Sequence, residues 1–275
     1  MKTCRIALTV LLLVVGLPVA LADEGVNPIF TSRFNLQLGV QRTDSEATVA
    51  VTRAPLPETE IDLDDMGIDE SSTVFYAGAR WRIADRWTAN FTYNQFDENG
   101  STVIEESFNF DGELYPVGAS LDSRLQLDAY IFDVAYSFGK GRNYEWGAGL
   151  GLHSFDFAAE LKADVFVGSI DQTVSEANES LLAPVPNFRF FADYAFDSRN
   201  AIRFNAGWLS ANIEDYDGAL IYASLRFDHN FGNNFGVGLG VQYTDVELDH
   251  EPSSRSREQY DADILGAMAY ISYRF

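Results

Sequence analysis

Apolar and polar residues alternate along ten segments of this chain. In the last segment, every second residue counted back from Phe275 to Leu265 is apolar, while the other register is mixed. Period-two alternation indicates a strand with one apolar face and one wetter face. In segment 87–94 four polar residues share one face, which favours a wet lumen over a dry core. The ten segments are 30–42, 73–83, 87–94, 123–138, 144–157, 187–196, 201–211, 219–231, 235–244 and 263–275.

The connections between these segments are of two kinds. Four are short, and the other five are mostly long and acidic. Short periplasmic turns and longer outer loops are the known polarity of outer-membrane barrels. The pattern therefore predicts an all-β fold, a transmembrane antiparallel up-and-down β-barrel of about ten strands, with eight or twelve as alternatives. The short turns are expected at 84–86, 139–143, 197–200 and 232–234, and the longest loops at about 43–72, 98–122 and 158–186.

The second long loop contains a hairpin signal, Asn99-Gly100. The residues after it could form another crossing, but Glu105 and Glu106 are adjacent, so one of them would face lipid. A carboxylate near the membrane midplane costs on the order of a few kcal/mol. The segment 98–122 is therefore predicted to be a β-rich excursion above the membrane.

Residues 1–22 have the three parts of a secretory signal peptide. A basic start precedes an apolar run from Ile6 to Leu17 and an Ala20-x-Ala22 ending, so cleavage is expected after Ala22. A retained anchor is disfavoured, because the run is shorter than the ~20 residues of a spanning helix. Cleavage removes the single cysteine, and with it two basic residues and no acid, so the formal net charge moves from −22 to −24.

Composition supports one barrel over residues 23–275. Aromatic residues make up 14% of the chain, and the mean hydropathy is −0.10. Many half-apolar strands fit these values better than a large buried core does. The strong negative charge argues against nucleic acid as a partner. Aromatic residues near the short turns predict a girdle at one membrane interface: Trp81, Trp87, Tyr144, Trp146, Phe196, Phe231, Tyr273 and Phe275.

Charged residues on the polar register are candidates for the lining of the lumen. Seven are cations and four are anions, although the protein as a whole is acidic. One interpretation is that they pair across the interior and plug it. The other is a narrow pore or binding lumen that favours small anions. The residues are Arg33, Arg80, Arg82, Asp133, Glu145, Arg189, Asp193, Arg203, Arg226, Asp228 and Arg274.

The histidines do not match known catalytic patterns of barrel enzymes. Outer-membrane lipid hydrolases use a His-x-Ser pair, and omptin proteases use an Asp-x-His pair, because the partners must share one face. Here His153 directly precedes Ser154, and each of the other two histidines, His229 and His250, is adjacent to an acid. Adjacent strand residues point to opposite faces. The sequence therefore predicts no enzyme activity and no cofactor.

Acidic residues cluster in the first long loop. Their carboxylates are hard oxygen ligands suited to Ca²⁺, but the spacing lacks the glycine and terminal glutamate of an EF-hand. A solvated acidic loop is the favoured interpretation, and a weak, shared association with divalent cations of the lipopolysaccharide layer is the alternative. The residues are Asp62, Asp64, Asp65, Asp69 and Glu70.

The signal peptide, the alternating strands, the short turns and the terminal Ala269-x-Ile271-x-Tyr273-x-Phe275 pattern resemble small Gram-negative outer-membrane β-barrel proteins. The resemblance covers essentially the whole mature chain and implies a place in the outer membrane, among lipid and lipopolysaccharide. It also implies the barrel assembly machinery as a partner, with Ile271, Tyr273 and Phe275 as the assembly signal. Segment 62–93 further resembles a group of proteobacterial barrels of uncharacterised activity.

Three functions are compatible with these patterns. The first is a narrow or occluded small-solute channel, or a structural membrane protein. The second is a surface binding or adhesion protein that acts through its acidic outer loops. The third, a membrane hydrolase, is disfavoured because no nucleophile and base share a face.

Overall fold

The computed structural model describes residues 25–53, 60–62, 64–110, 113–167, 170–213, 216–253 and 256–275. The expected signal peptide, residues 1–22, lies outside the described residues. The elements are α2 (Pro28–Thr31), β1 (Phe34–Arg53), β2 (Ile61–Asp62), β3 (Ser71–Ala84), β4 (Trp87–Val103), β5 (Phe108–Phe110), β6 (Glu113–Tyr115), β7 (Ser120–Lys140), β8 (Tyr144–Val167), β9 (Ile170–Ala195), β10 (Asn200–Ile213), β11 (Tyr216–Phe231), β12 (Phe235–Ser253) and β13 (Ser256–Arg274).

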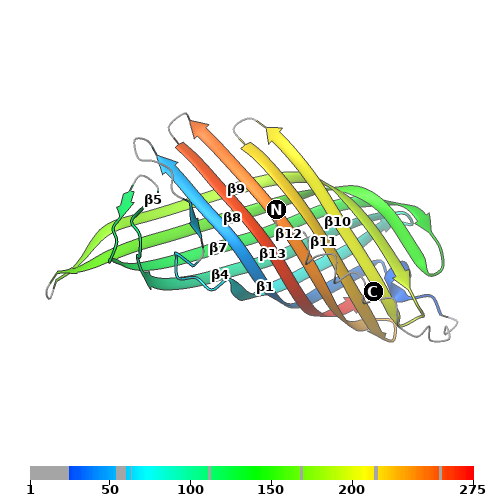
Figure 1. The fold of residues 1–275 in the computed structure, drawn as a ribbon. Coiled ribbons are helices and arrows are strands. Elements are labelled where there is room, and N and C mark those ends of the chain that lie inside the picture. The colour runs from blue at the N-terminus through cyan, green and yellow to red at the C-terminus, as the bar shows by residue number, and fades with distance from the viewer. Residues whose placement is uncertain are drawn as a thin grey trace, which may run out of the picture.

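Ten long antiparallel strands form a closed ring (Figure 1). Neighbours in sequence pair in turn, and the last strand returns to the first, with Leu36 opposite Tyr273 and Leu38 opposite Ile271. Closure leaves no unpaired edge in the ring, which a membrane requires because an unpaired peptide group in hydrocarbon costs several kcal/mol. The predicted up-and-down barrel of ten strands and its four short turns are confirmed.

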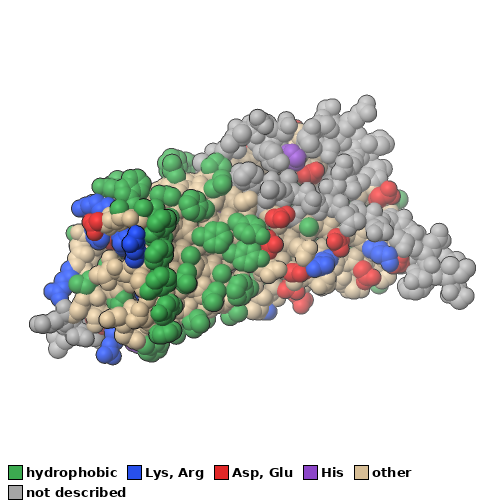
Figure 2. Space-filling model, turned by 180° about the vertical axis from the view of Figure 1, so that it is seen from behind, with side chains coloured by type: hydrophobic (Ala, Val, Ile, Leu, Met, Phe, Trp, Pro, Cys, Tyr) green, Lys and Arg blue, Asp and Glu red, His purple; other side chains and the backbone are tan. Residues whose placement is uncertain are grey.

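Apolar side chains cover the outside of the barrel in a band (Figure 2). Each of the ten strands contributes at least one large apolar side chain that is more than a third exposed. Such a surface is stable against lipid but not against water. Examples, one from each strand in order, are Leu38, Phe75, Phe91, Phe132, Leu150, Phe188, Trp208, Phe227, Leu239 and Ile271. Among the described residues, no helix is long and apolar enough to cross a membrane.

The short turns and both ends of the described chain lie at the same end of the barrel. The backbone N–H groups of Arg33 and Phe34 donate to the carbonyl oxygen of Phe275. The sequence predicted a strand from Phe30, but residues 28–31 form the short helix α2 and the strand begins at Phe34. Asn27 caps this helix through its side-chain oxygen, and Pro28 suits the first helical position, which needs no N–H donor.

At the opposite end the strands continue beyond the expected boundaries. The expected loop 158–186 is largely strand, because β8 runs to Val167 and β9 starts at Ile170. β8 alone has 24 residues, roughly 80 Å of extended chain, whereas a crossing takes about 9 to 11 residues. The expected loop 43–72 is likewise strand as far as Arg53. Alternation of apolar and polar residues predicts a strand only where one face meets lipid. Strands with water on both faces lack this alternation and are not predicted by it.

A small apolar core lies inside these extended strands. It includes Met66 and Ile68 from the first expected loop, and Phe110 and Tyr115 from the second. Asn99-Gly100 does not turn the chain; Gly100 lies in the β4 ladder opposite Ser123, and a Cβ there would lie 2.5 Å from the Met66 carbonyl oxygen. The glycine therefore permits close packing of the two outer segments, which together form a folded outer platform.

Candidate luminal site

Charged side chains inside the barrel form a continuous chain of ion pairs near the short-turn end. Four arginines alternate with three carboxylates contributed by β3, β8, β9, β10, β11 and β13. We call this set the luminal floor. Its contacts are Arg82–Glu145 (2.7 Å), Arg80–Glu145 (3.5 Å), Arg80–Asp193 (3.0 Å), Arg203–Asp193 (3.3 Å), Arg203–Asp228 (4.0 Å) and Arg274–Asp228 (3.0 Å).

The carboxylates of the floor also accept hydrogen bonds from neutral and cationic groups. The Glu145 carboxylate accepts hydrogen bonds from both terminal nitrogens of Arg82, at 2.8 and 2.7 Å, and from the Ser137 hydroxyl at 2.5 Å. The Tyr270 hydroxyl donates to Asp228 at 3.3 Å. Buried charges are stable only when they are paired and hydrogen-bonded in this way. The pairing therefore connects β3 with β8 and β9 across the interior at this level.

The N-terminal segment lies across the same end of the barrel. The Asn27 side chain donates to the Asp197 carbonyl oxygen at 3.0 Å and accepts from Asn230 at 3.0 Å. Ile29 and Phe30 are buried against Ala195 and Ala201. This segment covers the floor from the side of the short turns.

Two further arginines lie outside the floor's chain of contacts. Arg189 pairs with Asp133 and with the Asn205 amide oxygen. Arg226 donates to the Tyr76 hydroxyl at 2.9 Å and lies over the Tyr76 ring, 5.7 Å from its centroid. Ten of the eleven predicted lumen residues are thus inside the barrel. Arg33, the eleventh, precedes β1 and is exposed, because the strand pattern does not extend back to it.

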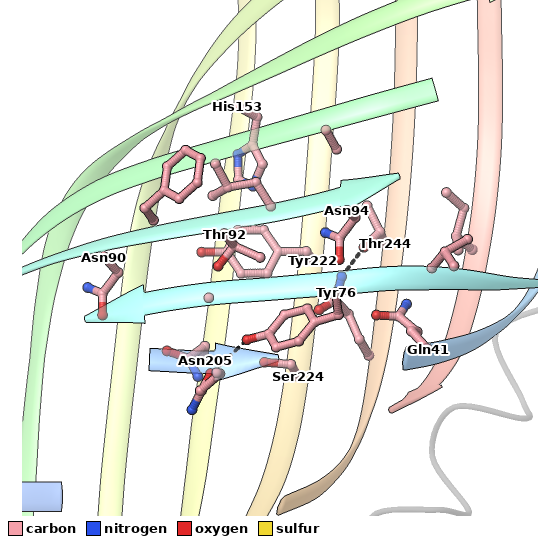
Figure 3. A pocket seen from close by; sticks show the side chains of 18 of the residues that line it. Gln41, Tyr76, Asn90, Thr92, Asn94, His153, Asn205, Tyr222, Ser224 and Thr244 are labelled. Carbon is pink, nitrogen blue, oxygen red and sulfur yellow. Dashed lines mark hydrogen bonds between the residues drawn. The ribbon is translucent and has the colours of Figure 1, made fainter. Parts of the chain in front are cut away.

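A cavity of about 140 Å³ lies next to these arginines (Figure 3). Its wall combines amide, hydroxyl and phenol groups with apolar side chains such as Val74, Leu127 and Ile264. Arg80, Arg189, Arg203 and Arg226 also line it. The labelled side chains in Figure 3 come from seven strands: Gln41, Tyr76, Asn90, Thr92, Asn94, His153, Asn205, Tyr222, Ser224 and Thr244.

Several polar atoms of the cavity wall are buried and have no hydrogen-bond partner among the described residues. They are Gln41 Oε1, Asn94 Oδ1, Ser224 Oγ and Arg226 Nε. The sequence pattern predicted Arg226 as a lumen residue and placed the polar face of segment 87–94, which includes Asn94, toward a wet lumen, but it did not single out Gln41 or Ser224. The same alternation marked them as inward-facing, but it carried no information about which groups lie at one height in the lumen.

The histidines remain apart from one another. His153 faces the lumen with its ring 5.2 Å from that of Tyr222. His229 Nδ1 is 2.8 Å from Asn200 Oδ1, and His250 pairs with Glu258 at 3.1 Å. Within the described ranges, no three His, Cys, Asp or Glu side chains are grouped so that they could hold a metal ion.

The expected assembly signal lies on the outer surface at the short-turn end. Tyr273 and Phe275 are exposed, and their rings are 5.8 Å apart. Phe275 also stacks on Phe34 at 5.2 Å, across the junction that closes the barrel. Ile271, two residues before Tyr273 on β13, is also exposed.

Comparison with known proteins identifies the fold. No protein-family model matches the chain, and no curated protein matches it. Among solved structures it is similar to the outer-membrane protease OmpT from Escherichia coli, with a TM-score of 0.58, 7% identity, and coverage of 88% of this chain and 96% of that one. OprG from Pseudomonas aeruginosa aligns with a TM-score of 0.42 and 12% identity over 89% of this chain and 96% of that one.

The OmpT likeness shows the fold alone, and the OprG alignment is too weak to carry an argument. The location follows from the fold together with the molecule's own surface. A closed ten-stranded barrel with an apolar band on every strand is stable in a bilayer, and its short turns lie opposite long outer extensions. The chain is therefore an outer-membrane β-barrel protein.

Proposed function

We propose that the lumen of this barrel is occluded. The protein is then a small-solute channel held closed or a structural membrane protein, rather than a permanently open pore. The continuous luminal floor supports this, because Arg80 of β3 reaches across the interior to Glu145 of β8 and Asp193 of β9. Passage would require buried pairs to separate, and breaking one buried pair costs about 3–5 kcal/mol. If the floor opens, its surplus of arginines favours small anions.

Single-channel recording in planar bilayers tests this proposal. The wild-type protein is expected to show no stable steps at neutral pH. A double variant, Arg203→Ala with Asp193→Ala, removes a neutral ion pair from the floor and is expected to show steps. The matched control, Arg124→Ala with Asp97→Ala, removes an exposed pair (3.0 Å) and should stay silent. Regular steps from the wild-type protein would contradict the proposal, as would silence from the luminal double variant.

A second function, binding at the cell surface, is favoured by the folded outer platform. Its apolar core joins the segments 61–68 and 104–121, so it presents an ordered surface rather than loose loops. Because each segment buries the other, deletion of one would unfold both. Alanine substitution of the exposed Val103, Leu114 and Val117 is the sharper test. It should reduce adhesion of expressing cells to host or abiotic surfaces if the platform binds there, and leave the heat-modifiable gel mobility of the barrel unchanged.

We further propose that the chain has no enzyme activity and that it meets four kinds of partner. These are outer-membrane lipid, lipopolysaccharide, the barrel assembly machinery and weakly held divalent cations at the acidic loops. The terminal aromatic residues and the acidic outer residues support these partners. The resemblance of segment 62–93 to proteobacterial barrels of uncharacterised activity also stays a proposal.

A further inference from the structure

The predicted luminal residues inside the barrel, toward its short-turn end, carry more positive than negative charge. Six of the predicted arginines face the lumen, against four carboxylates. The floor combines four arginines with three acids, and Arg189 is matched by Asp133. Within this set of ten residues a surplus of two cations thus remains, and a buried charge without a counter-charge is costly.

One of these two surplus cations belongs to the floor, and the other is Arg226. Arg203 and Arg226 are direct partners in the β10–β11 register, and both face inward. Like charges directly opposite each other destabilise a sheet. Arg203 is compensated by Asp193 and Asp228, whereas no carboxylate among the described residues lies within 4.0 Å of Arg226.

Arg226 is also held in a fixed orientation with one donor unused. Its Nη1 donates to the Tyr76 hydroxyl at 2.9 Å and to Gln37 at 3.4 Å, so the guanidinium cannot turn freely. Its Nε is buried without a partner among the described residues, and so is the Ser224 hydroxyl, two residues earlier on the same face of β11. Both line the cavity. Figure 3 shows Ser224 directed into it between Asn205 and Tyr76.

We propose that the luminal cavity binds a small oxyanion at Arg226 and Ser224, with inorganic phosphate as its representative. A tetrahedral oxyanion can accept from the Arg226 Nε–H and the Ser224 hydroxyl together and compensate the surplus charge. The cavity of about 140 Å³ is large enough to admit a tetrahedral anion of five heavy atoms. A neutral sugar would leave the charge uncompensated.

The site rests on the proposed closed floor only in one respect: the floor would make it a place where the anion is held rather than passed on. Binding and closure have separate measurements. Phosphate binding together with single-channel steps would overturn closure and leave the site intact. A protein that shows no single-channel steps and binds no phosphate would overturn the site and leave closure intact.

Isothermal titration of the folded protein in detergent micelles with sodium phosphate, at constant ionic strength, tests the site. The wild-type protein and Arg42→Gln, which removes an exposed outward arginine, are expected to bind phosphate equally. Arg226→Gln is expected to weaken binding at least tenfold, which corresponds to about 1.4 kcal/mol. Arg226→Lys keeps the charge but lacks the Nε–H geometry, so it should give an intermediate affinity, and Ser224→Ala a loss of severalfold.

Heat-modifiable gel mobility establishes that each variant is folded before titration, and Arg226→Lys keeps the test valid if Arg226→Gln does not fold. Three results would overturn the proposal: no phosphate binding by the wild-type protein, equal affinity in Arg226→Gln, or glucose binding as tightly as phosphate. The last result would identify the cavity as a neutral polar site.

Discussion

Glu145 is the carboxylate on which the floor depends most. It is completely buried and accepts from Arg82 and Ser137 while it pairs with Arg80. Glu145→Gln would leave the guanidinium group of Arg82 without a carboxylate partner among the described residues, and Arg80 with Asp193 alone. We expect a loss of about 3–5 kcal/mol in the free energy of unfolding, the usual effect of breaking a buried pair. Urea unfolding in micelles measures this.

The exposed pair of Asp97 and Arg124 provides the control for that substitution. Asp97→Asn removes a comparable bidentate interaction, but water already screens it, so little change is expected. Equal effects of the two substitutions would show that the floor is no more important to stability than a surface ion pair.

Above the apolar band, carboxylates face one another across β12 and β13. Asp245 lies opposite Asp263, and Glu247 lies opposite Asp261. Burial, and then the neighbouring carboxylate of Asp263, raise the pKa of Asp245 above its ordinary value, and the same two causes raise the pKa of Asp261. The charged forms therefore destabilise the fold. This cost is fully present above the folded-state pKa and is lost as the pH falls through it.

Asp263→Asn is accordingly expected to raise the urea midpoint at pH 7. The gain should vanish near pH 3, below the ordinary Asp pKa of about 3.9, because the neighbouring carboxyls are then neutral. Asp122→Asn is the control: Asp122 lies opposite Lys162, so its loss should bring no gain at pH 7. A gain from Asp263→Asn that persists unchanged at pH 3 would refute the repulsion argument.

At the scale of an element, the inward glycines of β12 make room for large luminal side chains from β13. A Cβ at Gly238 would lie 2.1 Å from the Tyr270 ring, and Tyr270 in turn donates to Asp228. Gly238→Ala should therefore force the tyrosine out of place and destabilise the barrel by about 1–3 kcal/mol, the usual cost of overpacking. The shift of the urea midpoint measures the effect.

Gly218→Ala provides the comparison within the same barrel. A Cβ there lies 3.1 Å from the end of the flexible Leu248 side chain and at an ordinary contact distance of 3.7 Å from the Glu247 carbonyl oxygen, so a smaller loss is expected. If Gly218→Ala proves as damaging as Gly238→Ala, the close approach of Tyr270 is not the reason for the glycine.

At the scale of the whole molecule, closure joins the first and last strands, and Phe275 lies at their junction. Phe275→Glu changes an exposed residue at the membrane interface, where a charge costs at most about 1 kcal/mol. Its effect on assembly in cells should be much larger if the terminal strand is the assembly signal. The fraction of outer-membrane chains with heat-modifiable mobility measures this, and refolding into lipid without cellular factors should be nearly normal.

Phe235→Glu is a matched control, because Phe235 is similarly exposed and its ring lies 4.9 Å from that of Tyr273, outside the terminal pattern. It should assemble almost normally. Normal assembly of Phe275→Glu in cells would remove the support for a signal at this residue.

Much of the fold could be predicted because lipid and a wet lumen impose opposite demands on the two faces of each strand. The residues 30–42 illustrate both the success and its limit: the alternation from Phe34 onward is observed, but Phe30 belongs to a helix buried under the floor. Arg33 was assigned to the lumen by continuing the same alternation too far back. In β8 and β9 the pattern ended where the lipid ended, although the strands continue.

The sequence by itself determined which side chains face inward and that the interior holds more arginines than acids, because facing depends only on odd or even position along a strand. The tertiary structure alone decided that Arg203 pairs with Asp193 while Arg226 meets no carboxylate. Partners depend on strand order, register and tilt, which bring residues far apart in the chain to one height. Whether the charges line a passage or close it was therefore a property of the assembled barrel.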